Sequence, residues 1–166
     1  MRTAVPVAEF QQAMAAFPAG ITAVTTVYEG EPAGLIATSV CSVSAEPPSI
    51  LVCVNQQAAA HHAIVSAGFF AVNLLTVGQR DVVDRFRTLR GPGRFEDERW
   101  SRLETGAPVL SDAAVVLDCV LDARHEGFSH TILVGVVKAS RVAGSAQAGS
   151  LLWHGRGYAH ALPLEK

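Results

Sequence analysis

The sequence predicts a mainly β protein with short helices, folded as a closed antiparallel β-barrel. Three observations favour this fold class. At least six segments have strand length and many β-branched residues, and most of them follow one another through short hairpin turns. The helical segments between them are short, and no repeat or long linker divides the 166 residues. Hydrophobic residues make up 49% of the chain, enough for one sizeable core, so we expect a single domain over residues 1–166.

The N-terminal half is predicted to hold helices and strands in alternation. Phe10, Met14 and Phe17 lie at helical spacing within residues 7–17, and Pro18 ends that helix. Strands are expected at 21–28, 34–44, 49–55 and 69–74, with a turn at 29–32. Short helices are expected at 58–67 and 78–86.

The C-terminal half is predicted to consist mainly of strands. Residues 87–93 are rich in Arg and Gly and are expected to form a surface loop. The segment 113–123 alternates as a half-buried strand does, with Val115, Leu117, Cys119 and Leu121 on one face and Asp118 and Asp122 on the other. Another long strand is expected at 130–142, a loop at 144–150, and a hairpin at 151–158 with Gly155 near its turn.

Charge and composition exclude several classes of protein. The net charge is −2 and the pI is near 6.3, so no basic field is available to hold nucleic acid. Only 17% of the residues are charged, which suggests that some apolar surface lies in an oligomer interface.

The cysteines and the N-terminus indicate the compartment. Cys41, Cys53 and Cys119 are odd in number and form no CxxC pair, so we expect reduced core residues of a cytosolic protein. Residues 1–6 lack the apolar segment of a signal peptide, and no apolar stretch approaches the length of a membrane span. We therefore expect a cytoplasmic protein without membrane contact.

Several common site motifs are absent from the sequence. It has no GxGxxG after a strand, no P-loop and no GxSxG elbow, which argues against a Rossmann site, a nucleotide-phosphate loop and a hydrolase nucleophile. The six histidines and three cysteines include no pair with metal-ligand spacing, so no metal site is predicted.

The most informative segment is 37–44, which holds four hydroxyl side chains and a thiol. Short hydroxyls beside a buried strand supply hydrogen bonds without bulk or charge, which suits a flat, polar-edged ligand such as a flavin ring. The alternative is a strand whose hydroxyls bond to solvent or to their own backbone.

Two histidines and a group of arginines are further candidates. His61 lies in the first turn of a predicted helix, where free N–H groups favour an anion, and the alternative is an exposed histidine that binds nothing. His130 follows Gly127 and opens a strand, so it either contacts a second substrate or lies in solvent. Seven arginines between residues 80 and 102 alternate with acidic residues, as on a solvated face, although one or two of them could bind a phosphate.

Taken in order, these segments resemble the short-chain flavin reductases, the reductase components of two-component flavin-dependent monooxygenases, which have an FMN-binding split-barrel fold. The resemblance runs from about Phe10 to Leu162. Its motifs are Phe17–Gly20, Gly34–Ser44, Pro47-Pro48, Val52–Asn55, Phe70–Leu75, Asp84–Phe86, Gly106–Leu110, Gly127–Ile132 and Gly157-Tyr158. Their order and spacing together are specific.

The resemblance implies a flavin reductase-like domain that transfers hydride from NADH or NADPH to FMN or FAD and supplies reduced flavin to a partner monooxygenase. It implies a homodimer with sites near the subunit interface. It also implies the roles of individual residues. The isoalloxazine ring would be lined by Thr38, Ser39, Val40 and Cys41, with Ser42 close by. The ribityl phosphate would be held by Asn55, Ala58, Ala60 and His61, with Arg85 and Phe86 nearby. His130 would act on the nicotinamide side as the catalytic residue, and Tyr158 would close the pocket.

The chain departs from the family pattern in two places. The turn after Asn55 lacks the usual Ser and Thr, so phosphate binding must rely on backbone amides, His61 or arginine. The usual Gly-Asp-His is replaced by Phe128-Ser129-His130, which removes the carboxylate beside the histidine.

Two alternative functions stay open at this point. One is a split-barrel protein that keeps FMN tightly and oxidises its own organic substrate. The other is a non-catalytic flavin- or haem-binding carrier or sensor. Hydride transfer from nicotinamide C4 to flavin N5 requires mainly that the two rings be stacked in register, and donors from residues 38–42 would stabilise the reduced ring.

Overall fold

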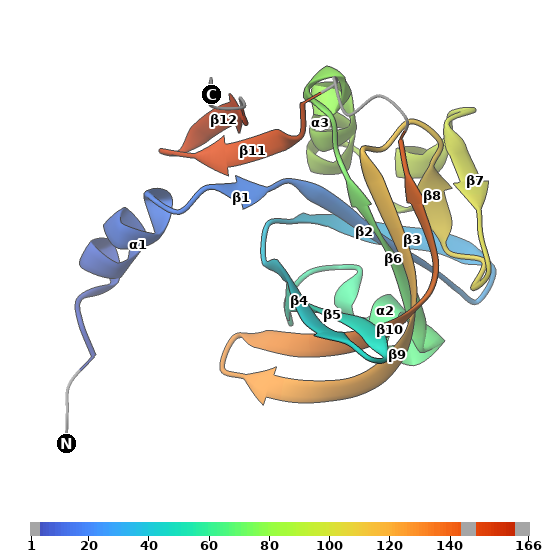
Figure 1. Cartoon of the computed structure of the whole chain (residues 1–166), viewed down its shortest axis with the longest axis horizontal. Helices are drawn as coiled ribbons and strands as arrows, with labels where there is room; N and C mark the ends of the chain where they lie inside the picture. The colour runs from blue at the N-terminus through green and yellow to red at the C-terminus, as the bar shows by residue number, and fades with distance from the viewer. Residues whose placement is uncertain (1–3, 144–148, 162–166) are drawn as a thin grey trace.

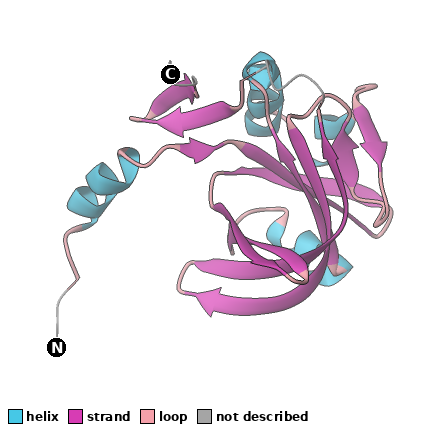
Figure 2. Cartoon of the chain, viewed as in Figure 1, coloured by secondary structure: helices cyan, strands magenta, loops and turns pink. Residues whose placement is uncertain are grey.

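We describe a computed structural model of the chain, which covers residues 4–143 and 149–161. Strands dominate it, as Figure 2 shows, and all strand pairs are antiparallel. The strands are β1 (Ala19–Gly20), β2 (Thr22–Tyr28), β3 (Glu31–Ala37), β4 (Val40–Ala45), β5 (Pro48–Asn55), β6 (Phe69–Leu74), β7 (Trp100–Arg102), β8 (Pro108–Leu110), β9 (Val115–Gly127), β10 (His130–Val142), β11 (Leu151–His154) and β12 (Gly157–His160). The helices are α1 (Val7–Ala15), α2 (His61–Ala67), α3 (Arg80–Thr88) and the 3-10 turns η1 (Val77–Gln79) and η2 (Gly91–Phe95).

Seven strands form one curved sheet in the order β3-β2-β6-β9-β10-β5-β4 (Figure 1). Its two edge strands, β3 and β4, are consecutive in the chain and are joined by Thr38 and Ser39. They do not pair with each other within the described residues. Because only two residues separate strands at opposite edges, the sheet curls until these edges come close without pairing, which is a split barrel.

Period-two alternation along the strands divides the core into two clusters. Ala23 and Val24 are consecutive in β2, and they face different clusters because successive strand residues point to opposite sides of a sheet. One cluster fills the barrel interior around Phe70 and is closed by Ile64 of α2. The other lies outside the sheet, where α3 and β8 cover it. Full burial of side chains as large as Phe70 contributes roughly 1.5–3 kcal/mol each.

Buried polar side chains tie the segment 105–110 to the sheet. Asn73 donates to the Ala23 carbonyl at 3.0 Å and accepts from Leu110 N–H at 2.8 Å. Asp118 accepts hydrogen bonds from both the amide and the hydroxyl of Thr105. Each of these buried groups has a partner, so the segment is held in register without an unpaired polar atom.

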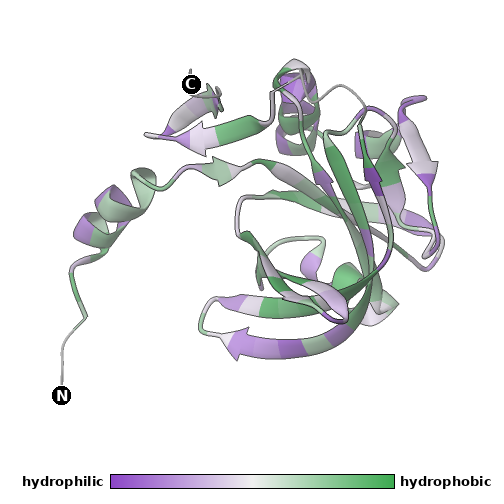
Figure 3. Cartoon of the chain, viewed as in Figure 1, coloured by the Kyte–Doolittle hydropathy of each residue, from purple (hydrophilic) through white to green (hydrophobic). Residues whose placement is uncertain are grey.

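Helix α1 and the terminal hairpin lie at the periphery. Figure 1 shows α1 projecting away from the barrel, and none of its residues is buried. The hairpin of β11 and β12 is joined to the body by pairing of β11 with β1. Figure 3 shows that the far end of the β9–β10 hairpin is largely hydrophilic, in agreement with the exposure of most residues from Asp122 to Glu126.

Several predicted elements are confirmed. Strands are present at 69–74 and 130–142 as expected, and those at 21–28 and 49–55 differ by one residue. The terminal hairpin turns at Gly155, whose φ of 59° suits a glycine. The loop expected at 144–150 lies mostly outside the described residues. That the chain forms one domain stays a prediction.

Other expectations were wrong in detail. The single strand expected at 34–44 is two strands, because the chain must cross from one sheet edge to the other at residues 38–39. The turn expected at 29–32 ends early, since β3 already begins at Glu31. The loop expected at 87–93 is partly helical, because α3 continues to Thr88 and η2 follows. Asp118 was expected on the solvent face and is fully buried, since Thr105 supplies its hydrogen bonds.

The cysteines also differ from the expectation. Cys119 is buried in the core, and burial raises the pKa of its thiol to about 12. Cys53 is half-buried and Cys41 is exposed on the edge strand, so only one of the three is a core residue. No helix within the described ranges is long and apolar enough to cross a membrane.

We expect Gly135→Ala to lower the free energy of unfolding by about 1–3 kcal/mol, the usual cost of overpacking a filled core. A Cβ at this buried position would lie 2.6 Å from Phe70 Cζ and 2.9 Å from Cys119 Cβ. Urea unfolding of both proteins measures the change. Gly93→Ala is the matched control, since a Cβ there meets no atom within 4 Å. If Gly135→Ala and Gly93→Ala had the same free energy of unfolding, the close packing of Phe70 and Cys119 around Gly135 would be contradicted.

Candidate functional site

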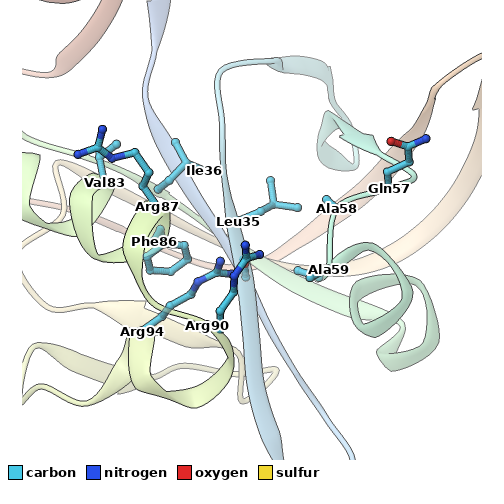
Figure 4. Close-up of a pocket in the computed structure, with 12 residues that line it drawn as sticks. Leu35, Ile36, Gln57, Ala58, Ala59, Val83, Phe86, Arg87, Arg90 and Arg94 are labelled. Carbon is cyan, nitrogen blue, oxygen red and sulfur yellow. The ribbon is translucent and has the colours of Figure 1, made fainter.

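The first element of the site is a cavity of about 340 Å³ between strand β3, the turn before α2, and helix α3 (Figure 4). Its walls come from Gly34–Ile36 of β3, Gln57–Ala60 of the turn, Val83, Phe86 and Arg87 of α3, and Arg90 and Arg94 beyond it. No carboxylate is among the described residues that line it. The cavity is therefore apolar on one side and cationic on the other.

The close contact between β3 and α3 depends on Gly34. A Cβ at this position would lie 2.7 Å from the Val24 carbonyl oxygen and 3.1 Å from a carbon of the Phe86 ring. Because that space is free, Phe86 packs against β3 and is only 4% exposed. The predicted site residue Phe86 thus forms one wall of the cavity.

The three arginines of this cavity are held differently. Arg94 donates to the Gly34 carbonyl at 2.8 Å and to the Leu89 carbonyl at 2.9 Å, and its guanidinium lies 5.4 Å from the Phe86 ring centre. Burial, together with the charge of Arg90, lowers the pKa of Arg94. Arg87 forms an exposed ion pair with Asp84 at 3.1 Å. Arg90 makes no ion pair or side-chain hydrogen bond with any described residue.

The opposite wall is a turn with free backbone donors. The Asn55 carboxamide oxygen accepts from Gln57 N–H at 2.8 Å, and the Asn55 carbonyl accepts from Ala58 N–H at 3.0 Å. The N–H groups of Ala59 and Ala60 have no acceptor among the described residues. Helix α2 has only seven residues, so this turn, rather than a long helix, supplies the donors.

A second cavity of about 470 Å³ continues from the first, with which it shares Ile36, Val83 and Arg87. Its far end is aromatic and is lined by Thr38, Trp153 and Tyr158. The rings of Trp153 and Tyr158 meet edge to face at 5.6 Å, and the guanidinium of Arg80 lies 4.6 Å from the Tyr158 ring centre. The two cavities together form one groove, which we call the α3 groove, with a cationic end and an aromatic end.

The residues predicted to line a flat ring lie at the edge of the barrel. Thr38 contributes to the α3 groove and to two neighbouring cavities, one of which also contains Ser39 and the other Val40. Cys41 and Ser42 are exposed on edge strand β4 and line none of these cavities. The structure thus brings Thr38 and Tyr158 together but leaves Cys41 and Ser42 on an open surface.

A third group of predicted residues gathers at the end of β10. His130 pairs in register with Asn55, and its Nδ1 lies 3.0 Å from the hydroxyl of Ser129. His61 does not reach the α3 groove, because its Nε2 lies 2.9 Å from the Thr131 hydroxyl. Asn55 and His130 lie opposite each other at the paired ends of β5 and β10, whereas His61 bonds to the next residue of β10, Thr131, which points to the other face of the sheet.

Arg85 is not part of the groove. Its guanidinium lies 3.8 Å from the Asp97 carboxylate and 3.5 Å from the Glu96 carbonyl. Asp97 also accepts a hydrogen bond from Arg99 at 2.8 Å, and this bond holds the pKa of the Asp97 carboxyl below its usual value. Arg99 in turn contacts Asp81 at 2.6 Å. This network fixes the segment after η2 against α3, which places Arg90 and Arg94 at the groove instead of Arg85.

The residues that sequence reasoning missed are Arg90, Arg94 and Trp153. The arginine-rich composition of residues 80–102 signalled a cationic surface, but not which members were already paired with carboxylates. Trp153 lay within a correctly predicted hairpin, and nothing in its local sequence indicated a groove.

Known proteins resemble this chain over nearly its whole length. Residues 14–162 match the model of the flavin reductase like domain. The chain is 40% identical over 156 residues to the FMN reductase (NADH) RutF 2 of Methylorubrum extorquens, covering 93% of this chain and 90% of the relative. The structure of the NADH:FAD oxidoreductase SgcE6 of Streptomyces globisporus has a TM-score of 0.86 at 30% identity, with 98% and 99% coverage. BorF, the flavin reductase component of a bacterial two-component tryptophan halogenase, has a TM-score of 0.86 at 29% identity, with 96% and 100% coverage.

An antiparallel split barrel with a groove of this chemistry defines a flavoenzyme of the split-barrel class. The sequence match is more specific, and the chain belongs to the flavin reductase like domain family. The resemblance drawn from the motifs and the split-barrel fold are thereby confirmed, and the protein is an oxidoreductase. The roles of individual site residues stay predictions.

We expect Asp97→Asn to lower the melting temperature at neutral pH, because the bond to Arg99 stabilises the ionised carboxylate. A carboxyl whose folded pKa is depressed stabilises the fold above its unfolded pKa of about 3.9 and loses that effect as pH falls through the folded value. Melting curves at several pH values measure the difference, which should disappear in acid. Asp84→Asn is the control, since the exposed Asp84–Arg87 pair contributes little. A difference that persists unchanged in acid would contradict this account.

Proposed function

We propose that the protein transfers hydride from NADH to FMN and releases the reduced flavin to a separate flavin-dependent monooxygenase. The observation that carries this proposal is the α3 groove, which has an aromatic end beside Thr38 and a cationic end beside free backbone amides. A flavin mononucleotide has the matching polarity, with an aromatic ring at one end and a phosphate at the other. The relative from Methylorubrum extorquens, an FMN reductase (NADH), supports the choice of both substrates.

The donor set fits the proposed flavin. Thr38 would offer its hydroxyl to the rim of the ring within the groove, which Tyr158 also lines, while Ser39, Cys41 and Ser42 follow along the open edge next to Thr38. The N–H groups of Ala59 and Ala60, which have no acceptor among the described residues, would hold the ribityl phosphate, while Asn55 holds their turn in shape. When bound, the flavin accepts a hydride from the reduced nicotinamide. The chain itself contributes positioning and hydrogen bonds.

His130 is proposed to contact the nicotinamide side of the second substrate. Its ring is half-exposed at the start of β10, and the Ser129 hydroxyl at 3.0 Å orients it. The Phe128-Ser129 turn contains no carboxylate, so only the hydroxyl stands beside the imidazole. His130 lines neither of the two cavities that make up the α3 groove.

We further propose that the protein is a homodimer. Helix α1 buries no residue and exposes Phe10 and Met14, and the outer edge of β4 has no partner among the described strands. A second copy would cover these surfaces and bring further residues to the ring edge, which is open on one chain. We also propose a cytoplasmic location, since three cysteines without disulfides suit a reducing compartment. BorF, which is one component of a two-component system, supports the proposal of a separate partner enzyme.

The decisive experiment measures NADH and NADPH oxidation in air, with and without added FMN or FAD. We expect oxidation that rises with added flavin and with NADH as the better donor. Yellow protein that oxidises no NADH would instead favour the tightly bound FMN oxidase. Colourless protein that is inactive with every flavin would overturn the reductase proposal.

We expect His130→Ala to lower kcat/KM for NADH by about ten- to a hundredfold, as for loss of one well-placed hydrogen bond. The Kd for FMN, measured by quenching of flavin fluorescence, should stay unchanged, because His130 does not line the groove. His125→Ala is the matched control on the neighbouring strand, where the side chain is exposed. An unchanged rate with NADH would remove His130 from the site.

A further inference from the structure

We propose that Arg90 is the residue that makes the site select a phosphorylated flavin over riboflavin. This inference rests on the proposed function, and it names the class of flavin that the α3 groove takes. It depends on which of the arginines at the groove is free to bind a ligand.

At the cationic end of the groove, one guanidinium is bonded to the chain and one has no partner among the described residues. Arg94 is the bonded one, because it donates to the carbonyls of Gly34 and Leu89 and stacks on Phe86. Arg90 has no ion pair or side-chain hydrogen bond to any residue in the described ranges. Figure 4 shows both guanidinium groups converging beside strand β3, opposite Ala58 and Ala59 of the turn.

Arg87 differs from Arg90 although both line the cavity. Its guanidinium pairs with Asp84 at 3.1 Å, and in Figure 4 it points towards Val83, away from the other two arginines. The charge of Arg87 is therefore partly neutralised by the chain itself. The charge of Arg90 is not neutralised in this way by any described residue.

Two like charges at one cavity, without a carboxylate in its described lining, favour an anionic ligand. The depressed pKa of Arg94 agrees with this, since one of its causes is the charge of Arg90. A phosphomonoester carries about 1.5–2 negative charges at neutral pH and offers three acceptor oxygens. The guanidinium of Arg90 presents a planar fork of donors that matches them. Riboflavin ends in a neutral hydroxyl and gains nothing from Arg90.

The experiment compares Arg90→Met with wild-type protein, using FMN and riboflavin as the two flavins. We expect the KM and the Kd for FMN to rise about tenfold, as for loss of one partly exposed charge-assisted contact. Both constants for riboflavin should stay unchanged. Arg90→Lys should restore part of the affinity for FMN, and the FMN affinity of the wild type should fall with salt more steeply than that of Arg90→Met.

Arg102→Met is the control, because it removes one positive charge from an exposed position on β7. Equal shifts for FMN and riboflavin, or none for FMN, would overturn the role of Arg90 while leaving the reductase intact. The Kd values are read from flavin fluorescence and do not depend on turnover. If wild-type protein bound FMN through Arg90 yet oxidised no NADH, this inference would stand and the proposed reductase function would fail.

Discussion

The absence of a side chain at Gly34 is the constraint on which the site depends. At this residue strand β3 lies so close to its neighbours that a Cβ would meet the Val24 carbonyl, the Phe86 ring and the Phe95 ring. That closeness lets Phe86, Phe95 and Trp100 form one aromatic cluster, and it lets Arg94 reach the Gly34 carbonyl. The cluster and the hydrogen bond hold the segment after α3, and that segment forms the cationic end of the groove.

The candidate site has two parts: the α3 groove, and the pair of Asn55 and His130, which we call the His130 group. The α3 groove combines side chains from β3, α3 and the terminal hairpin, which are far apart in sequence. The His130 group comes from the paired ends of β5 and β10. The 57–60 turn connects the two parts, because it lines the groove and is bonded to Asn55, the residue opposite His130. The outer edge of β4 has no strand partner among the described residues, so this side of the site is open on a single chain.

Much of the fold could be predicted from sequence because most strands carry their own pattern. Residues 69–74 and 130–142 are rich in β-branched side chains, and their bounds were predicted without error. The break at Thr38 and Ser39 could not be predicted, because it arises from curling of the whole sheet, while local strand propensity is continuous there. The burial of Asp118 depends on Thr105, and no local rule connects the two. The sequence similarly indicated a cationic surface, but only the packing shows that Asp97 pairs with Arg85 and that Arg90 has no side-chain partner in the described part of the chain.

The strand order also determines how the chain can reach this fold. Within the seven-stranded sheet three pairs, β2–β3, β4–β5 and β9–β10, are hairpins of neighbouring segments and require only short loops to close. Pairing of β6 with β2 and with β9, and of β5 with β10, joins segments that are distant in sequence, and such long-range pairing slows folding. In the finished sheet β6 connects the β2–β3 hairpin to the β9–β10 hairpin, and the pairing of β5 with β10 adds the β4–β5 hairpin. Because β4 pairs only with β5 among the described strands, the edge that carries the hydroxyls of residues 38–44 can open without unfolding the rest of the sheet.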